Sequence, residues 1–319
     1  MTFWTIPLII VGMVLLIKGA DYFVDGASSI ARALKIPTLI IGLTLVSLGT
    51  TLPESSVSIM TALQGSSDMS LGNVVGSNIF NTIVILGIGA LICPIAINKE
   101  AKNLYIPILC GLYVLLITFA FVITPNSLDR WEGIILILLL IGYLTLVVLR
   151  ALKSSKEMLD GQAQEDEEAI KPIWLSLILV VIGVAGIVFG ADLVVDNAVD
   201  FATAVGMSEK LVGLTILSVG TSLPELITGI VAALKKENDI ALGNIVGACT
   251  LNIIFILGVC STIVPLAVAS AVLIDLLVML ATGLVLLIIV FTSKKLNKWH
   301  GLAMIAMYIA YLVYIIIRN

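Results

Sequence analysis

The sequence predicts an all-α integral membrane protein with ten transmembrane helices, arranged as two inverted five-helix repeats in which helices 2 and 7 are broken. Hydrophobic residues make up 60% of the 319 positions and charged residues only 12%, and the mean hydropathy is +1.18. A soluble domain with so much apolar surface would precipitate. The chain also repeats itself, because residues 19–97 align without a gap to residues 190–268 and roughly 34 of the aligned positions are identical.

Ten apolar runs approach the length of about 20 residues that crosses a bilayer. The first lacks a preceding basic region and a cleavage site, so we expect a spanning helix there rather than a signal peptide. Five runs in each half is an odd number, so the second half should enter the membrane in the opposite orientation. We therefore predict a first repeat over 1–150, a linker over 151–172 and a second repeat over 173–319. The ten runs are 3–25, 38–64, 71–93, 104–123, 131–150, 173–195, 209–234, 241–266, 270–291 and 299–317.

The loops predict the orientation of the chain in the cell membrane. About 13 lysine and arginine residues fall on one side of the predicted spans and about 3 on the other. The basic side should be cytoplasmic, which places both termini outside and the linker inside. The acidic run 165–168 in this linker favours a solvated connection, with a calcium sensor as the alternative. Nothing in the sequence supports binding of nucleic acid.

The second and seventh runs each contain a signal that breaks a helix. Pro53 lacks a backbone N–H and its ring clashes with the carbonyl of Gly49, while Pro224 and Gly220 repeat the arrangement. Within a bilayer, freed carbonyls are tolerated only where they face protein or a water-filled cavity, and they can then bind a cation. Each break is therefore a candidate ion site.

Polar side chains reinforce both breaks. Ser47, Thr50 and Glu54 have the spacing of one helical face, and the second half reproduces this face with Ser218, Thr221 and Glu225. On the following helices, polar stripes run through Asn73, Ser77 and Asn81 and through Asn244, Ala248 and Asn252. Small polar residues also serve ordinary helix packing, which remains the alternative for the stripes alone.

The two glutamates favour function over packing, because a carboxylate at mid-membrane is costly and this one is duplicated. Carboxylate, hydroxyl, amide and carbonyl oxygens suit calcium, sodium or magnesium and suit copper or zinc poorly. Two close carboxylates would repel each other unless they were protonated or bridged by a cation. A divalent ion between Glu54 and Glu225 would neutralise both.

The segments 49–54 (Gly-Thr-Thr-Leu-Pro-Glu) and 220–225 (Gly-Thr-Ser-Leu-Pro-Glu) are each followed by Gly-Asn-x-Val-Gly. They resemble the two alpha repeats of the sodium/calcium exchanger family. The resemblance covers nearly the whole chain, whose length is similar to that of compact prokaryotic members without the large cytosolic regulatory domain. It implies four clustered cation sites at mid-membrane, built from helices 2, 3, 7 and 8, for which calcium and sodium compete.

The resemblance also implies roles for individual residues. Carboxylate ligands of calcium would be Glu54 and Glu225. Hydroxyl or carbonyl oxygens would come from Thr50, Thr221, Ser47 and Ser218, a shared sodium ligand from Ser77, a central polar pair from Asn81 and Asn252, and hydroxyls lining the pore from Thr51 and Ser222.

Two positions depart from the family pattern. Ala248 stands where well-known members place the second-half counterpart of Ser77, so one hydroxyl ligand is missing and a sodium site should be weaker. Asn252 stands where some archaeal and potassium-dependent members carry aspartate, which argues against potassium co-transport. It leaves a formal site charge of −2, which one calcium ion balances.

The sequence therefore predicts an electrogenic antiporter that exchanges sodium for calcium by alternating access. The alternative is a calcium/proton antiporter that uses the same two glutamates. A passive cation channel fits less well, because channels usually assemble a ring of subunits whereas this chain supplies both halves itself and could act as a monomer. An intramembrane enzyme is the least supported class, since neither a metalloprotease motif nor a Ser/His pair is evident. No cofactor is expected beyond the transported calcium and sodium ions.

Overall fold

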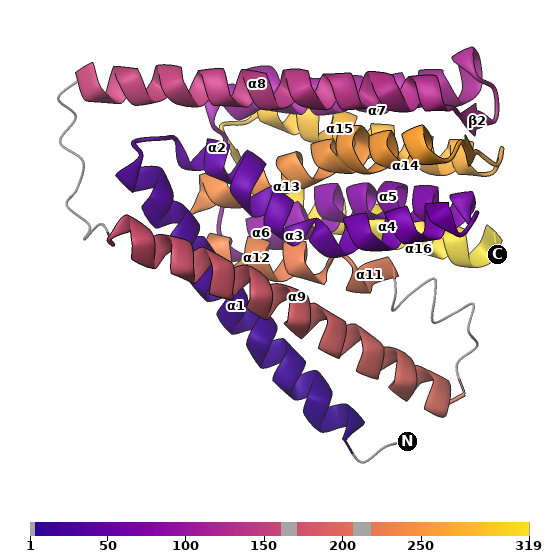
Figure 1. Cartoon of the computed structure of the whole chain (residues 1–319), viewed down its shortest axis with the longest axis horizontal. Coiled ribbons are helices and arrows are strands. Elements are labelled where there is room, and N and C mark those ends of the chain that lie inside the picture. The colour runs from indigo at the N-terminus through magenta and orange to yellow at the C-terminus, as the bar shows by residue number, and fades with distance from the viewer. Residues whose placement is uncertain (1–3, 161–170, 207–217, 319) are drawn as a thin grey trace.

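The computed structural model describes residues 4–160, 171–206 and 218–318. Within these ranges, eight continuous helices are long and apolar enough to cross a membrane, and a bent pair of helices brings the number of candidate spans to nine. The all-helical, multi-pass fold agrees with the prediction. Most of the long helices run roughly parallel in layers, whereas α1 (Thr5–Ala33) and α9 (Ile173–Ala204) lie side by side and cross the others obliquely (Figure 1).

The rest of the first half follows the predicted spans closely, with π-helical turns (η) inserted into several helices. The second span comprises a short helix, a π-helical turn and two more helices. The elements are α2 (Thr38–Ile41), η1 (Gly42–Val46), α3 (Ser47–Thr50), α4 (Leu52–Leu63), α5 (Ser67–Ile79), η2 (Phe80–Ile85), α6 (Leu86–Ile92), β1 (Ile95–Ala96), η3 (Ala101–Tyr105), α7 (Ile106–Thr118), η4 (Phe119–Ile123), β2 (Ser127–Leu128) and α8 (Arg130–Asp160).

The second half repeats this order where it is described. The predicted span 209–234 begins outside the described residues, so only its second part can be compared, and the number of ten spans stays a prediction. The elements are α11 (Ser218–Gly220), α12 (Leu223–Leu234), α13 (Asn238–Leu251), η6 (Asn252–Leu257), α14 (Gly258–Ile263), β3 (Leu266–Ala267), α15 (Val272–Thr292), β4 (Lys295–Leu296) and α16 (Lys298–Arg318).

Both proline signals coincide with interruptions of a helix. The segment Thr38–Thr50 and the helix Leu52–Leu63 meet at an angle of 51°. Pro53 then occupies the first turn of α4, where its missing N–H costs no hydrogen bond. In the second half a turn at residues 221–222 separates α11 from α12, and Pro224 lies in the first turn of α12. Each glutamate of the repeat therefore lies in the first turn of a helix that starts inside the protein.

Glycines allow α1 and α9 to approach until their backbones touch. A Cβ added at Gly190 would lie 2.6 Å from the backbone nitrogen of Leu16, and one at Gly19 would lie 2.7 Å from that of Ile187. Close backbone approach through small residues is typical of helix pairs in membranes. The same pair packs against both breaks, because a Cβ at Gly49 would meet Phe23 of α1 and one at Gly220 would meet Val195 of α9.

We expect Gly190→Ala to lower the melting temperature of the purified protein, because the new methyl group would press on backbone atoms that cannot move aside. Overpacking of this kind costs about 1–3 kcal/mol. The matched control is Gly142→Ala in α8, where an added Cβ meets nothing within 4 Å. Equal melting temperatures for the two variants would contradict the close packing of α1 and α9.

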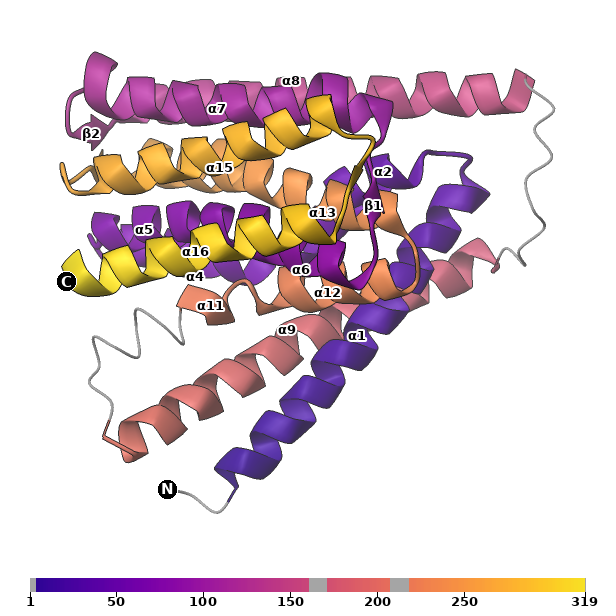
Figure 2. The ribbon, with the colours of Figure 1, turned by 180° about the vertical axis from the view of Figure 1, so that it is seen from behind.

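Two short antiparallel ribbons connect the halves. β1 pairs with β4 in the register Ile95↔Leu296, and β2 pairs with β3 in the register Leu128↔Leu266. The ribbons lie at opposite ends of the helical layers (Figure 2). Each ribbon takes one strand from each half, so the two halves are joined at both ends of the bundle.

Ion pairs tie α1 to the end of α12. Lys235 Nζ lies 2.6 Å from Asp21 Oδ1 and 2.5 Å from Asp25 Oδ1. Asp21 and Asp25 both belong to α1, so Lys235 bridges two carboxylates of one helix from a neighbouring element.

Asp275 lies in the first turn of α15. Its carboxylate accepts hydrogen bonds from the Arg318 guanidinium at 3.0 and 3.1 Å and from the Tyr311 hydroxyl at 3.0 Å. The aspartate therefore fastens the C-terminal helix α16 to α15.

Candidate cation-binding site

Two buried glutamates occupy the interior of the helical layers. Glu54 and Glu225 are 1% and 0% exposed, and they lie in the first turns of α4 and α12. The positive end of a helix dipole favours a carboxylate at this position. The sequence repeat therefore places one acidic group at each interrupted helix, and both groups are removed from solvent.

Each half supplies a hydroxyl to the glutamate of the other half. Ser222 Oγ donates to Glu54 Oε1 at 2.6 Å, and Thr51 Oγ1 donates to Glu225 Oε1 at 3.2 Å. Thr51 and Ser222 are equivalent positions of the repeat. The two breaks are therefore cross-linked by reciprocal hydrogen bonds, with both carboxylates in one polar cluster.

A second reciprocal pair joins the breaks to the following helices. Thr50 Oγ1 donates to Asn244 Oδ1 at 3.2 Å, and Thr221 Oγ1 donates to Asn73 Oδ1 at 3.1 Å. Both asparagines belong to the stripes recognised in the sequence, although neither was among the predicted ligands. The bonds bring the predicted residues Thr50 and Thr221 next to the glutamate cluster.

Serines complete the cluster on the Glu54 side. Ser77 is 1% exposed, and its hydroxyl lies within hydrogen-bond distance of Ser222 Oγ, at 3.1 Å. Because the single Ser222 proton goes to Glu54, Ser77 is the donor in this contact. Its repeat counterpart Ala248 is fully buried and has no hydroxyl to offer. Ser47 donates its own hydroxyl to Leu43 O at 2.9 Å, while its carbonyl accepts from the backbone of Thr51 at 3.0 Å. The side chain of Ser218 lies outside the described part of the chain.

The predicted central pair, Asn81 and Asn252, is fully buried at equivalent π-helical segments, η2 and η6. Such segments are frequent at functional sites. Asn252 Nδ2 donates to Asn78 Oδ1 at 2.9 Å, whereas Asn81 has no hydrogen-bond partner within the described ranges. Asn78 was not predicted from the sequence, because it lies beside the polar stripe of its helix and its repeat counterpart, Cys249, is not a polar amide.

Several buried oxygen atoms of this cluster lack a hydrogen-bond donor. Most buried polar atoms in proteins have a partner, so an accumulation of unpaired acceptors needs an explanation. Carboxylate and amide oxygens are ligands for hard cations, and a bound cation would satisfy them. Among the described residues, the unpaired acceptors of the cluster are Glu54 Oε2, Glu225 Oε2, Asn81 Oδ1 and Asn252 Oδ1.

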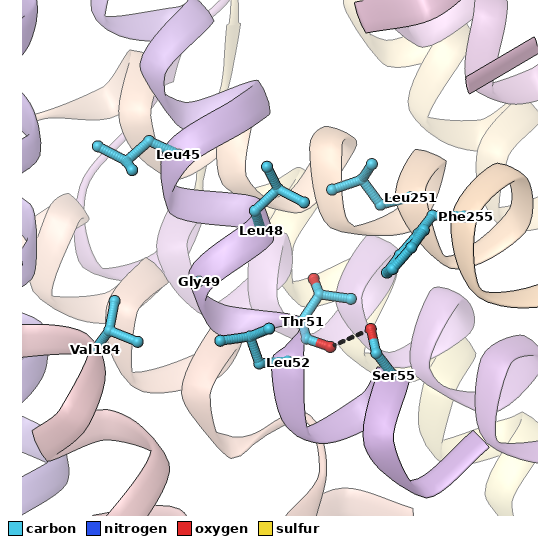
Figure 3. A pocket seen from close by; sticks show the side chains of 9 residues that line it. All are labelled: Leu45, Leu48, Gly49, Thr51, Leu52, Ser55, Val184, Leu251 and Phe255. Atoms are coloured by element: carbon cyan, nitrogen blue, oxygen red, sulfur yellow. Dashed lines mark hydrogen bonds between the residues drawn. The ribbon is translucent and has the colours of Figure 1, made fainter. Parts of the chain in front are cut away.

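An apolar cavity of about 310 Å³ reaches the first break (Figure 3). Leu48 and Leu52 line it on one side and Leu251 and Phe255 on the other. Thr51 also lines it, and the carbonyl of this residue accepts a hydrogen bond from Ser55 Oγ at 2.8 Å. The cavity therefore lies directly beside the residue whose hydroxyl contacts Glu225.

The fold and the cluster together define a class. The chain is a multi-pass helical membrane protein whose buried centre holds two carboxylates, each of which accepts a hydrogen bond from a hydroxyl of the other half of the chain.

Comparison with known proteins gives the family. The model of the sodium/calcium exchanger protein family matches residues 4–149 and 175–317. The chain therefore belongs to the sodium/calcium exchanger family, as the paired motifs predicted. The family is one of membrane antiporters rather than enzymes.

Relatives and solved structures match over almost the full length. The putative antiporter CaxA of Alkalimonas amylolytica is 39% identical over 95% of this chain and 96% of its own. The sodium/calcium exchanger MaX1 of Methanosarcina acetivorans is 32% identical over 96% of this chain and 97% of its own. The structure of the sodium-calcium exchanger NCX_Mj soaked with 2.5 mM Na⁺ and 10 mM Sr²⁺ superimposes with a TM-score of 0.85, at 30% identity, over 98% of this chain and 99% of that one.

Proposed function

We propose that this chain exchanges sodium for calcium across the cell membrane by alternating access at the glutamate cluster. The observation that carries the proposal is the set of four buried, unpaired oxygens at Glu54, Glu225, Asn81 and Asn252. Leaving such acceptors without a partner is costly, and hard cations bound in the cluster would satisfy them. The relative CaxA is named a putative antiporter and the relative MaX1 a sodium/calcium exchanger, and both names support the proposal.

The proposed ligands combine charge with neutral oxygens. Two glutamates would contribute a formal charge of −2, which one calcium ion balances. Sodium ions would occupy overlapping positions that use the same carboxylates. The neutral contributors are the hydroxyls or carbonyls of Ser47, Thr50, Thr51, Ser77, Ser218, Thr221 and Ser222 and the amides of Asn81 and Asn252.

We further propose that residues 1–150 and 173–319 are inverted repeats joined by a cytoplasmic linker at 151–172. The reciprocal hydrogen bonds between Thr51 and Glu225 and between Ser222 and Glu54 support a pseudo-two-fold relation. The exchange of strands between the halves in both ribbons supports it as well. An odd number of spans in each repeat would place both termini on the same side of the membrane. The excess of lysine and arginine on the opposite side would make the side of the termini the outer one.

Alternating access would come from movement of α1 and α9 as one unit across the other helices. Their close backbone contact and their packing against both breaks support this assignment. A site that carries an uncompensated charge of −2 would be very costly to move through a low dielectric, so only the loaded site would allow the movement. If three sodium ions replaced one calcium ion, each cycle would move one net charge and depend on voltage.

Calcium/proton antiport is the second candidate, because protons on Glu54 and Glu225 would also neutralise the site. Ala248 favours it, since the Glu225 side lacks the hydroxyl that Ser77 provides on the Glu54 side.

Ala248→Ser should strengthen sodium binding if sodium is the coupling ion. The added hydroxyl restores one ligand, and a hydrogen bond or ligand of this kind is worth about 0.5–1.5 kcal/mol, or about two- to tenfold in affinity. The measurement is the sodium concentration that half-inhibits calcium uptake. Ser77→Ala should shift this concentration in the opposite direction, and no shift in either variant would argue for proton coupling.

The test of the proposed function is calcium-45 uptake into proteoliposomes loaded with sodium, potassium or choline at matched pH. Uptake driven by internal sodium alone would support sodium/calcium exchange. Uptake that ignores sodium but follows an imposed proton gradient would establish the second candidate. Uptake without any counter-ion gradient, at a rate that does not saturate with calcium, would indicate a channel.

A further inference from the structure

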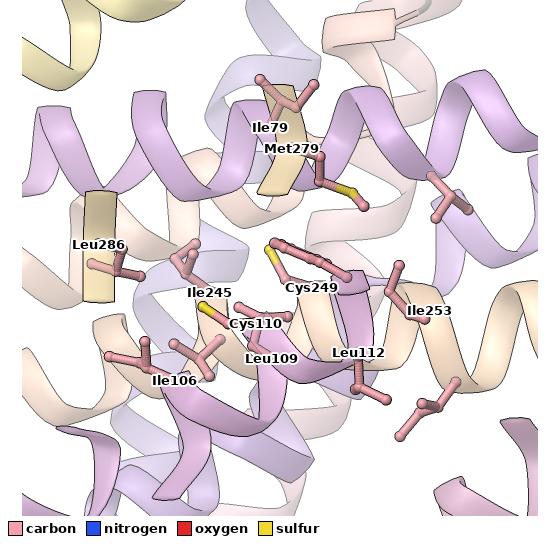
Figure 4. Packing of buried hydrophobic residues seen from close by; sticks show 14 of the residues in the cluster. Ile79, Ile106, Leu109, Cys110, Leu112, Ile245, Cys249, Ile253, Met279 and Leu286 are labelled. Atoms are coloured by element: carbon pink, nitrogen blue, oxygen red, sulfur yellow. The ribbon is translucent and has the colours of Figure 1, made fainter. Parts of the chain in front are cut away.

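Asn78 is a buried amide that lies beside the proposed ligands without being one of them. It belongs to α5 and is 0% exposed. Its Nδ2 donates to the carbonyl of Cys249 at 3.2 Å and contacts Met279 Sδ at 3.8 Å, while its Oδ1 accepts from Asn252 Nδ2 at 2.9 Å. Cys249 and Met279 lie close together in the buried cluster of Figure 4. Asn78 therefore connects α5 to α13, η6 and α15.

These contacts fix which way each amide faces. The Cys249 carbonyl and the Met279 sulfur can only accept a hydrogen bond, so the group of Asn78 that meets them must be its NH₂. The oxygen of Asn78 is then the atom that faces Asn252, and only the NH₂ of Asn252 can donate to it. The oxygen of Asn252 is left on the other side of its amide as a buried acceptor, with no donor in the described part of the chain.

The other half of the repeat has no equivalent of the hydrogen bond between Asn252 and Asn78. The counterpart of Asn78 is Cys249, and the counterpart of Asn252 is Asn81. Neither the nitrogen nor the oxygen of Asn81 has a hydrogen-bond partner among the described residues. A cysteine side chain is a weak hydrogen-bonding group, so it cannot orient an amide as Asn78 does. One asparagine of the pair is therefore held in a single orientation and the other is not.

We propose that Asn78 is a positioning residue for cation binding, which holds the Asn252 amide so that its oxygen is available to the ion. The proposal rests on the proposed function, because it needs Asn252 to be a ligand. It assigns Asn78 no contact with the ion. An amide free to turn would present its NH₂ to the cation in part of the molecules, and the hydrogen bond to Asn78 removes those states before binding.

The test is calcium binding to the purified protein, measured by isothermal titration calorimetry, with melting temperature as a check of folding. Asn78→Leu keeps the approximate volume and removes both amide functions. Loss of a group that orients a metal ligand typically weakens metal binding about ten- to hundredfold. Asn78→Ala serves as the second variant if the leucine does not fold. The matched control is Thr82→Val, one helical turn after Asn78. It removes a fully buried hydroxyl whose neighbour is Cys249 Sγ. This control should change the calcium affinity by less than about twofold.

A double-mutant cycle separates positioning from a general structural role. In an Asn252→Ala background there is no amide to orient, so Asn78→Leu should change the calcium affinity by less than about twofold. An equal loss of affinity in both backgrounds would overturn the proposal, and so would unchanged affinity in Asn78→Leu alone. Failure of the parent protein to bind calcium would instead refute the proposed function, which distinguishes the two failures.

Discussion

Glu54→Gln and Glu225→Gln should each abolish calcium uptake by proteoliposomes. Glutamine keeps the size of the side chain and an oxygen that can accept from Ser222 or Thr51, so the hydrogen bonds between the halves can persist. It removes one of the two negative charges that would balance calcium in a buried environment. Loss of one partner from a buried charge pair costs about 3–5 kcal/mol, so uptake should fall by about a hundredfold or more.

The control for this experiment is Glu100→Gln. Glu100 lies 3.6 Å from Arg150, and its side chain is 34% exposed. The substitution therefore removes a carboxylate of the same chemistry outside the glutamate cluster. Its uptake should equal that of the parent. Substantial uptake by either Glu54→Gln or Glu225→Gln would show that the two glutamates do not act as one calcium site.

Asn252→Asp should make calcium uptake depend strongly on pH. An ionised aspartate would raise the formal site charge to −3, so the calcium-loaded site would keep one negative charge and resist movement through low dielectric. A protonated aspartate would restore the charge of the parent site. Uptake relative to the parent should therefore be greatest in acid and should fall as pH rises, by up to about tenfold per pH unit once the aspartate loses its proton.

The matched variant is Asn252→Ser, which stays neutral at every pH. It should follow the pH profile of the parent protein even if its calcium affinity is lower. If Asn252→Asp took up calcium as fast as the parent at every pH, this result would contradict the role assigned to the charge of the site.

Much of the fold was predictable because the membrane restricts a chain to few structures. Apolar runs located the long helices to within a few residues at many of their ends, and the Pro53 and Pro224 signals coincided with the interruptions of two helices. Helices such as α1 and α9 run about two turns beyond their predicted ends, because helical structure continues where the apolar run has stopped. Hydropathy marks the membrane core and does not mark the ends of a helix.

The cluster was predictable as a list of residues and not as a set of contacts. The repeat singled out Glu54 and Glu225, because a duplicated acidic residue in an apolar run is unusual. The sequence did not reveal that Ser222 would reach Glu54 and that Thr51 would reach Glu225. Contacts between halves depend on how the interrupted helices cross, and that geometry arises from packing of the whole bundle.

Asn78 shows most clearly which part of the cluster could not be predicted from the sequence. Helical periodicity selected Asn81 because it lies four residues after Ser77, yet the neighbouring Asn78 forms the hydrogen bond to Asn252. A comparison of the two halves could have drawn attention to it, since an asparagine faces a cysteine at that position of the repeat. Asn78 is marked by a difference between the two repeats, whereas the predicted ligands are marked mainly by features that the repeats share.

Calcium binding at a series of sodium concentrations, measured by isothermal titration calorimetry on the purified chain, tests the central claim most directly. A single site built on Glu54 and Glu225 predicts one calcium ion per chain and an apparent calcium affinity that falls more steeply than in proportion to sodium, because several sodium ions replace one calcium. Calcium affinity that is unchanged by sodium, or two independent calcium ions per chain, would contradict one shared site for both ions.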